Sequence, residues 1–144
     1  MKRVLTDAFI NTTVLSSLYL RNNELRSVVP GSFVNLPSLS SLFMENNKLT
    51  SLLSGTFADL PALANLYLQN NHIISIENET FPAQIRHLDL SNNKYFDFRH
   101  DNPFTNLTQL RTLQLSGNDI TDVPDTALQG LQSLTTLSVL LFIN

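Results

Sequence analysis

Three chemically active side chains alternate along one short segment of the chain: His87, Asp89 and Ser91. Alternate residues of a β-strand point to the same face, so this segment would present an imidazole, a carboxylate and a hydroxyl together. Such a set suggests nucleophilic catalysis or metal binding. However, side chains two residues apart on a strand are about 6.7 Å apart, which places His87 and Ser91 roughly 13 Å from each other. The serine is out of reach of its base and the metal site is incomplete, so we expect no catalytic residue, metal or cofactor.

The composition excludes several other functions. The chain has four glycines and no phosphate-cradling glycine loop, and its formal net charge of −3 provides no basic patch for nucleic acid. It has no cysteine, so its stability must come from packing, and this absence leaves the compartment open. We therefore expect neither an enzyme nor a nucleic-acid-binding protein.

No segment has the features of a membrane span or a signal peptide. Residues 1–5 begin like a secretory leader, but Asp7 and Asn11 interrupt any apolar region. The apolar run over residues 138–143 is far too short to cross a bilayer.

Internal repetition organises almost the whole chain. Five copies of the pattern Leu-x-x-Leu-x-Leu-x-x-Asn-x-Leu begin at residues 15, 39, 63, 85 and 110, in steps of 24, 24, 22 and 25 residues. A phenylalanine recurs in the second half of most copies, and a sixth copy opens at Leu134. The asparagine slot is filled by Asn23, Asn47, Asn71, Asn93 and Asn118.

Each slot of this pattern has a physical reason. The Leu-x-Leu portion predicts a short strand with its leucines inward, and strands of successive units would stack in parallel about 4.8 Å apart. A buried asparagine can satisfy backbone groups that the turn after the strand leaves unpaired. The phenylalanines would form a second stack behind the leucines. One unit cannot bury both rows alone, so cohesion must come from neighbouring units.

The pattern resembles the typical, extracellular class of leucine-rich repeats, whose unit has about 24 residues. The resemblance implies an α/β repeat fold: a right-handed solenoid shaped as a horseshoe. A parallel sheet lies on its concave face, and irregular or short helical segments lie on its convex face. Members are mostly secreted proteins or receptor ectodomains, such as Toll-like receptors and small leucine-rich proteoglycans, and usually recognise proteins. Many carry cysteine-rich end caps, which this sequence lacks.

We expect residues 1–144 to form a single repeat domain, with five full repeats and a partial repeat at each end. Solenoid ends normally need a polar cap, and this chain starts within a unit and ends on an apolar run. We therefore expect it to be a fragment of a longer receptor. The alternative is a compact protein whose end is capped by a partner or by self-association.

The outward positions of the expected strands define a candidate binding face on the concave side. Three aromatic residues occupy the same exposed slot in adjacent units, and aromatic side chains are frequent anchors of protein interfaces. The same ladder would also stabilise the sheet through cross-strand contacts worth roughly 0.2–1 kcal/mol each. A competing surface is the loop over residues 99–103, although such an insertion is more often only tolerated. The expected ligand-binding residues are Tyr19, Arg21, Phe43, Glu45, Tyr67, Gln69, His87, Asp89 and Gln114.

Three N-glycosylation sequons, at Asn11, Asn78 and Asn106, bear on the compartment. None lies on an expected concave strand, so glycans there would leave the binding face clear. With the class of repeat, they favour an extracellular or cell-surface location over the cytoplasm. We therefore expect a non-catalytic module that recognises a protein ligand. The alternatives are a structural spacer or an intracellular scaffold.

Overall fold

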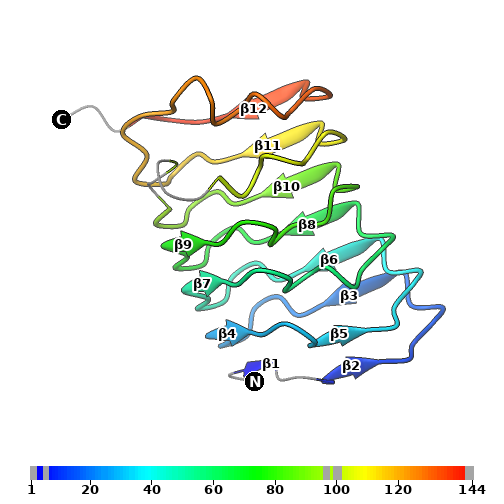
Figure 1. Cartoon of the computed structure of the whole chain (residues 1–144). Coiled ribbons are helices and arrows are strands. Elements are labelled where there is room, and N and C mark those ends of the chain that lie inside the picture. Colours follow the sequence, from blue (N-terminus) through cyan, green and yellow to red (C-terminus); the bar gives the residue numbers. More distant parts are fainter. Residues whose placement is uncertain (1–2, 5–6, 96–97, 99–101, 142–144) are drawn as a thin grey trace.

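The computed structural model describes residues 3–4, 7–95, 98 and 102–141. Figure 1 shows successive coils of the chain stacked on one another, each contributing one strand to a six-stranded sheet. Neighbouring strands are parallel, and the spatial order is β12-β11-β10-β8-β6-β3. The strands are β3 (Ser17–Tyr19), β6 (Ser41–Phe43), β8 (Asn65–Tyr67), β10 (His87–Asp89), β11 (Thr112–Gln114) and β12 (Thr136–Ser138).

Equivalent residues of successive units pair with one another throughout this sheet. Leu18 is opposite Leu42 and Leu42 is opposite Leu66, and Leu42 and Leu66 are completely buried. The strands begin one residue earlier than the Leu-x-Leu portion predicted. The backbone ladder nevertheless continues beyond them, because the amide of Leu20 donates to the carbonyl of Phe43 (2.7 Å).

The rest of each coil is irregular. Three two-stranded parallel sheets link the second halves of neighbouring coils. They join β1 (Arg3–Val4) to β4 (Ser27–Val28), β2 (Phe9–Ile10) to β5 (Phe33–Val34), and β7 (Ser51–Leu52) to β9 (Ser75–Ile76). Turns connect these elements, and no residue within the described ranges is helical. Of the two alternatives that the sequence left open, irregular or short helical, the structure shows the irregular one.

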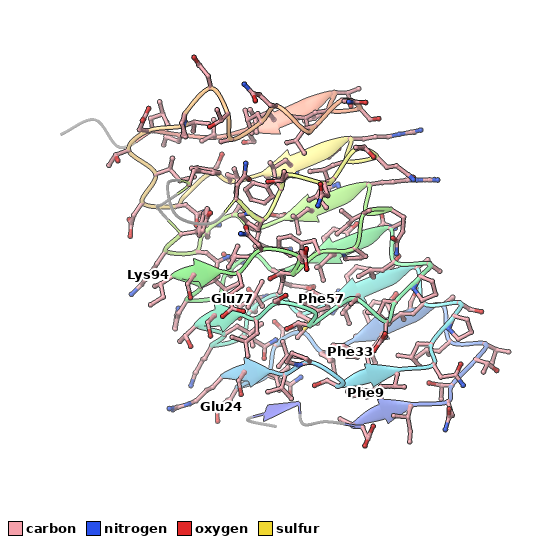
Figure 2. All side chains as sticks on the ribbon, viewed as in Figure 1. Phe9, Glu24, Phe33, Phe57, Glu77 and Lys94 are labelled. Carbon is pink, nitrogen blue, oxygen red and sulfur yellow. The ribbon has the colours of Figure 1, made fainter. Side chains whose placement is uncertain are left out.

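A stack of phenylalanine rings runs through the interior behind the leucines. Figure 2 shows Phe9, Phe33 and Phe57 one above another in successive coils. Phe81 and Phe104 continue the stack, and the ring centres along it are 5.9, 6.1, 6.3 and 6.3 Å apart. Phe33 to Phe104 are all buried, so leucines and phenylalanines share one continuous core.

The repeated asparagines bridge adjacent coils. Asn71 is 4% exposed; its Oδ1 accepts from the amide of Leu49 (3.0 Å), and its Nδ2 donates to the carbonyls of Met44 (3.1 Å) and Leu68 (3.0 Å). Asn47, Asn93 and Asn118 make equivalent bonds and are equally buried. These bonds satisfy backbone groups that the turn would otherwise leave unpaired.

Asn23 does not follow this pattern. The sequence predicted a buried side chain, but Asn23 is exposed and donates only to the carbonyls of Leu20 (3.0 Å) and Arg21 (3.1 Å). In the next unit, the amide that bonds the asparagine lies 22 residues earlier. The corresponding residue for Asn23 is Met1, which is outside the described residues.

A second asparagine row lies on the surface, and the sequence analysis missed it. Asn46 donates to Oδ1 of Asn22 (2.8 Å) and Asn70 donates to Oδ1 of Asn46 (2.9 Å). All three have φ near +57°, a left-handed conformation that asparagine tolerates better than most residues. The Asn-Asn doublets in the sequence were the signal: the first residue makes the turn and the second is buried in three of the doublets. In the fifth unit Gly117 (φ +71°) replaces the first asparagine.

Candidate binding face

The outward side chains of the six-stranded sheet, with the residue two positions beyond each strand, form what we call the sheet face. On the three strands at one end of this face, β3, β6 and β8, the rings of Tyr19, Phe43 and Tyr67 stack in register. The Tyr19 and Phe43 ring centres are 4.5 Å apart with the planes 8° from parallel, and those of Phe43 and Tyr67 are 4.7 Å apart at 4°. The imidazole of His87 follows at 5.0 Å, tilted by 44° from the ring of Tyr67. We call the three stacked rings the aromatic ladder.

The ladder has its geometry because of the parallel, in-register pairing of β3, β6 and β8. One slot recurs at the strand spacing, which brings planar side chains into face-to-face contact. Stacked aromatic pairs are worth about 0.5–1.5 kcal/mol beyond the area that they bury, so the ladder also stabilises the sheet. Tyr19 is 58% exposed, while Phe43 and Tyr67 are half-buried. The ring edges form an apolar strip that solvent still reaches.

Beside the ladder, Arg21, Glu45 and Gln69 occupy equivalent positions in three successive coils. The guanidinium of Arg21 lies 5.2 Å from the centre of the Tyr19 ring, and its Nη1 is 3.6 Å from Oε1 of Glu45. Glu45, one of the expected ligand-binding residues, is only 8% exposed. Its position is outward, as expected; the face is nevertheless so closely packed that it is largely covered.

Asp89, another of the expected ligand-binding residues, is covered to the same extent. It is 8% exposed and accepts hydrogen bonds from the amide (2.9 Å) and hydroxyl (2.6 Å) of Ser91. The carboxylate therefore closes a local turn. His87 and Gln114 are half-buried on the same face. The serine hydroxyl is bound to the aspartate and not to the histidine, and within the described ranges no three His, Cys, Asp or Glu side chains are grouped to hold a metal ion.

The three sequons lie away from the sheet face. Asn11, Asn78 and Asn106 are all exposed. Oδ1 of Asn11 accepts from Asn35 of the next coil (2.8 Å). Asn78 and Asn106 line a hollow of about 470 Å³ between neighbouring coils. Most of the loop over residues 99–103, the competing surface, is outside the described residues.

Comparisons with known proteins agree with the repeat pattern. A family model described as leucine rich repeat matches residues 13–73 and 83–139. No curated protein sequence matches the chain at a significant level. Among solved structures, the crystal structure of a TLR13–ssRNA13 complex is similar, with 29% sequence identity and a TM-score of 0.81. The similarity covers 86% of this chain and 18% of that one, so this chain spans less than a fifth of the larger protein. The predicted resemblance to Toll-like receptor ectodomains is confirmed.

Proposed function

The chain belongs to the leucine-rich repeat family, and from this premise we propose that it is a recognition module that binds a protein ligand on the sheet face. The family match and the similarity to a Toll-like receptor support a non-catalytic interaction module. The observation that carries the finer proposal is the aromatic ladder. The rings of Tyr19, Phe43 and Tyr67 form one contiguous apolar strip that solvent reaches, and polar side chains lie beside it on the sheet face.

The ladder favours a protein over single-stranded nucleic acid, which the similar TLR13 complex contains. Stacking platforms for bases need free ring faces. Here the faces of Phe43 are covered by Tyr19 and Tyr67 at 4.5 and 4.7 Å, and Arg21 lies over Tyr19. The net charge of −3 also disfavours binding to the phosphates of a nucleic acid.

We propose that the module is a single repeat domain of a longer extracellular or cell-surface protein. The three exposed sequons off the sheet face and the Toll-like receptor similarity support this. No helix within the described residues is long and apolar enough to cross a bilayer.

A binding screen with two matched variants tests the proposal. The labelled chain is presented to an array of purified ectodomains and secreted proteins, and to single-stranded RNA oligonucleotides. The ladder variant replaces Tyr19, Phe43 and Tyr67 with alanine. The control variant replaces Val14, Leu53 and Ile74, which are 90%, 38% and 53% exposed off the sheet face, with alanine.

The proposal predicts protein partners that the ladder variant binds at least about tenfold more weakly, while the control variant binds them as the original chain does. Circular dichroism establishes that both variants are folded. If the folded ladder variant keeps every interaction, the repeats act as a spacer. A ladder-dependent complex with RNA alone would replace the protein partner with a nucleic acid.

A further inference from the structure

Two hydrogen-bond acceptors on the sheet face have no donor among the residues that the structure describes. They are Oε2 of Glu45 and Oε1 of Gln69, and both atoms are buried. The two residues occupy equivalent positions, each two residues beyond the paired Phe43 and Tyr67. The backbone ladder extends to both, because Asn22 donates to the carbonyl of Glu45 (3.0 Å) and Asn46 to that of Gln69 (3.1 Å). Their backbones are therefore about one strand spacing, ~4.8 Å, apart.

A buried carboxylate oxygen without a donor is energetically unfavourable, and folded proteins rarely leave one unpaired. The other oxygen of Glu45 does not compensate for it. Its ion-pair partner Arg21 is 3.6 Å away, longer than a hydrogen bond, and the side chain of Arg21 is 52% exposed. An ion pair of this length, with one partner largely in solvent, contributes little. A ligand group with several N–H donors would satisfy both acceptors.

The neighbouring rings indicate which kind of cation fits. Phe43 and Tyr67 belong to the same coils as Glu45 and Gln69, and their half-buried edges offer apolar surface beside the two acceptors. Arginine and lysine side chains combine a charged head with an apolar stem that packs on such surfaces. A free metal ion fits less well, because the described residues provide no group of three metal-ligating side chains.

We propose that the ligand inserts the head of an arginine or lysine between Glu45 and Gln69, with its stem against Phe43 and Tyr67. The inference rests on the proposed function, since it names the partner chemistry that the sheet face selects. The incoming head donates to Oε2 of Glu45 and Oε1 of Gln69. It displaces Arg21, the internal cation that is loosely paired with the same carboxylate.

A peptide library provides the probe. Its central residue is fixed as arginine, lysine, glutamine or glutamate, and its flanking positions are random. Peptides are selected for binding to the original chain, to the Glu45→Gln variant and to the Glu24→Gln variant. Glu24 is the matched control, because it removes the same charge from an exposed position at the edge of the stack (Figure 2). We expect the chain and Glu24→Gln to enrich arginine and lysine. Selected peptides should bind Glu45→Gln about tenfold more weakly, the loss expected for a charged hydrogen bond.

Two further variants keep the test decisive if Glu45→Gln unfolds. Gln69→Leu removes the second acceptor and should also weaken these peptides, whereas Arg21→Gln removes the internal competitor and should tighten their binding. The inference is overturned if peptides that require the aromatic ladder show no preference for a basic centre, or bind Glu45→Gln and Gln69→Leu unchanged; the proposed function then stands. If no selected peptide requires the ladder, both the inference and the proposed function fail.

Discussion

Replacing Asn71 with alanine isolates what the buried asparagine row contributes. The side chain makes three hydrogen bonds, and the alanine variant loses all of them, but only one of the three backbone partners is left without another hydrogen bond. The carbonyl of Met44 still accepts from Nδ2 of Asn47, and the carbonyl of Leu68 still accepts from Nδ2 of Asn93. The backbone amide of Leu49 loses its acceptor, Oδ1 of Asn71, and Leu49 is completely buried.

The magnitude follows from this count. One buried amide without an acceptor costs about 1–3 kcal/mol, and the packing lost around the truncated side chain brings the total to about 2–4 kcal/mol. Asn23→Ala is the control, because Asn23 is exposed and bonds no amide of another coil among the described residues. We expect it to cost less than about 1 kcal/mol.

Urea unfolding followed by circular dichroism measures both free energies. For a slope of about 2 kcal/mol per molar urea, Asn71→Ala should lower the midpoint by about 1–2 M, while Asn23→Ala should change it much less. Asn71→Asp retains the acceptor but places a carboxylate beside two carbonyls, so it should be at least as destabilising as the alanine. Equal losses for Asn71→Ala and Asn23→Ala would refute the bridging role assigned to the buried row.

Two further predictions concern the turn at Gly117 and the exposed ion pair of Glu24 with Lys48. Gly117→Ala should lower the free energy of unfolding more than Gly55→Ala. Both glycines have φ above +70°, but a Cβ at Gly117 would lie 2.2 Å from Oδ1 of Asn92, whereas one at Gly55 meets nothing within 4 Å. In urea unfolding, Gly117→Asn, which extends the exposed asparagine row, should be better tolerated than Gly117→Ala. The pKa of Glu24 lies below its ordinary value because Lys48 donates to Oε1 (2.9 Å) and adds its positive charge. The pair therefore stabilises the fold at pH values above the ordinary carboxyl pKa, and this stabilisation is lost as the pH falls through the lowered pKa. Lys48→Gln should raise the pKa of Glu24 in an NMR titration.

The repeat pattern predicted the parallel sheet well, because leucine periodicity depends on burial and one unit's geometry repeats in the next. Leu42 and Leu66 are opposite each other as the alignment required. The exposed turn asparagines were missed for a different reason. Their role depends on backbone conformation, and φ near +57° at Asn46 is visible in the sequence only as the first member of an Asn-Asn doublet.

The candidate site was harder to predict, because outward direction and exposure are different properties. Alternation along a strand gives the direction of Glu45 and Asp89 correctly. Whether they are accessible depends on which side chains stand beside them in the neighbouring coils, and on local bonds such as that from Ser91 to Asp89. The aromatic ladder was predictable, since three planar residues recur in one slot. The two acceptors without donors were not, because they depend on side-chain conformations.

The binding face depends on the in-register pairing of β3, β6 and β8, which brings equivalent residues of three coils together. Nuclear Overhauser contacts between ring protons test it directly in a sample whose aromatic residues are selectively labelled. We expect contacts between the rings of Tyr19 and Phe43 and between those of Phe43 and Tyr67, residues 24 positions apart in each case, and none between Tyr19 and Tyr67. Absence of both contacts, or a direct contact between Tyr19 and Tyr67, would contradict it.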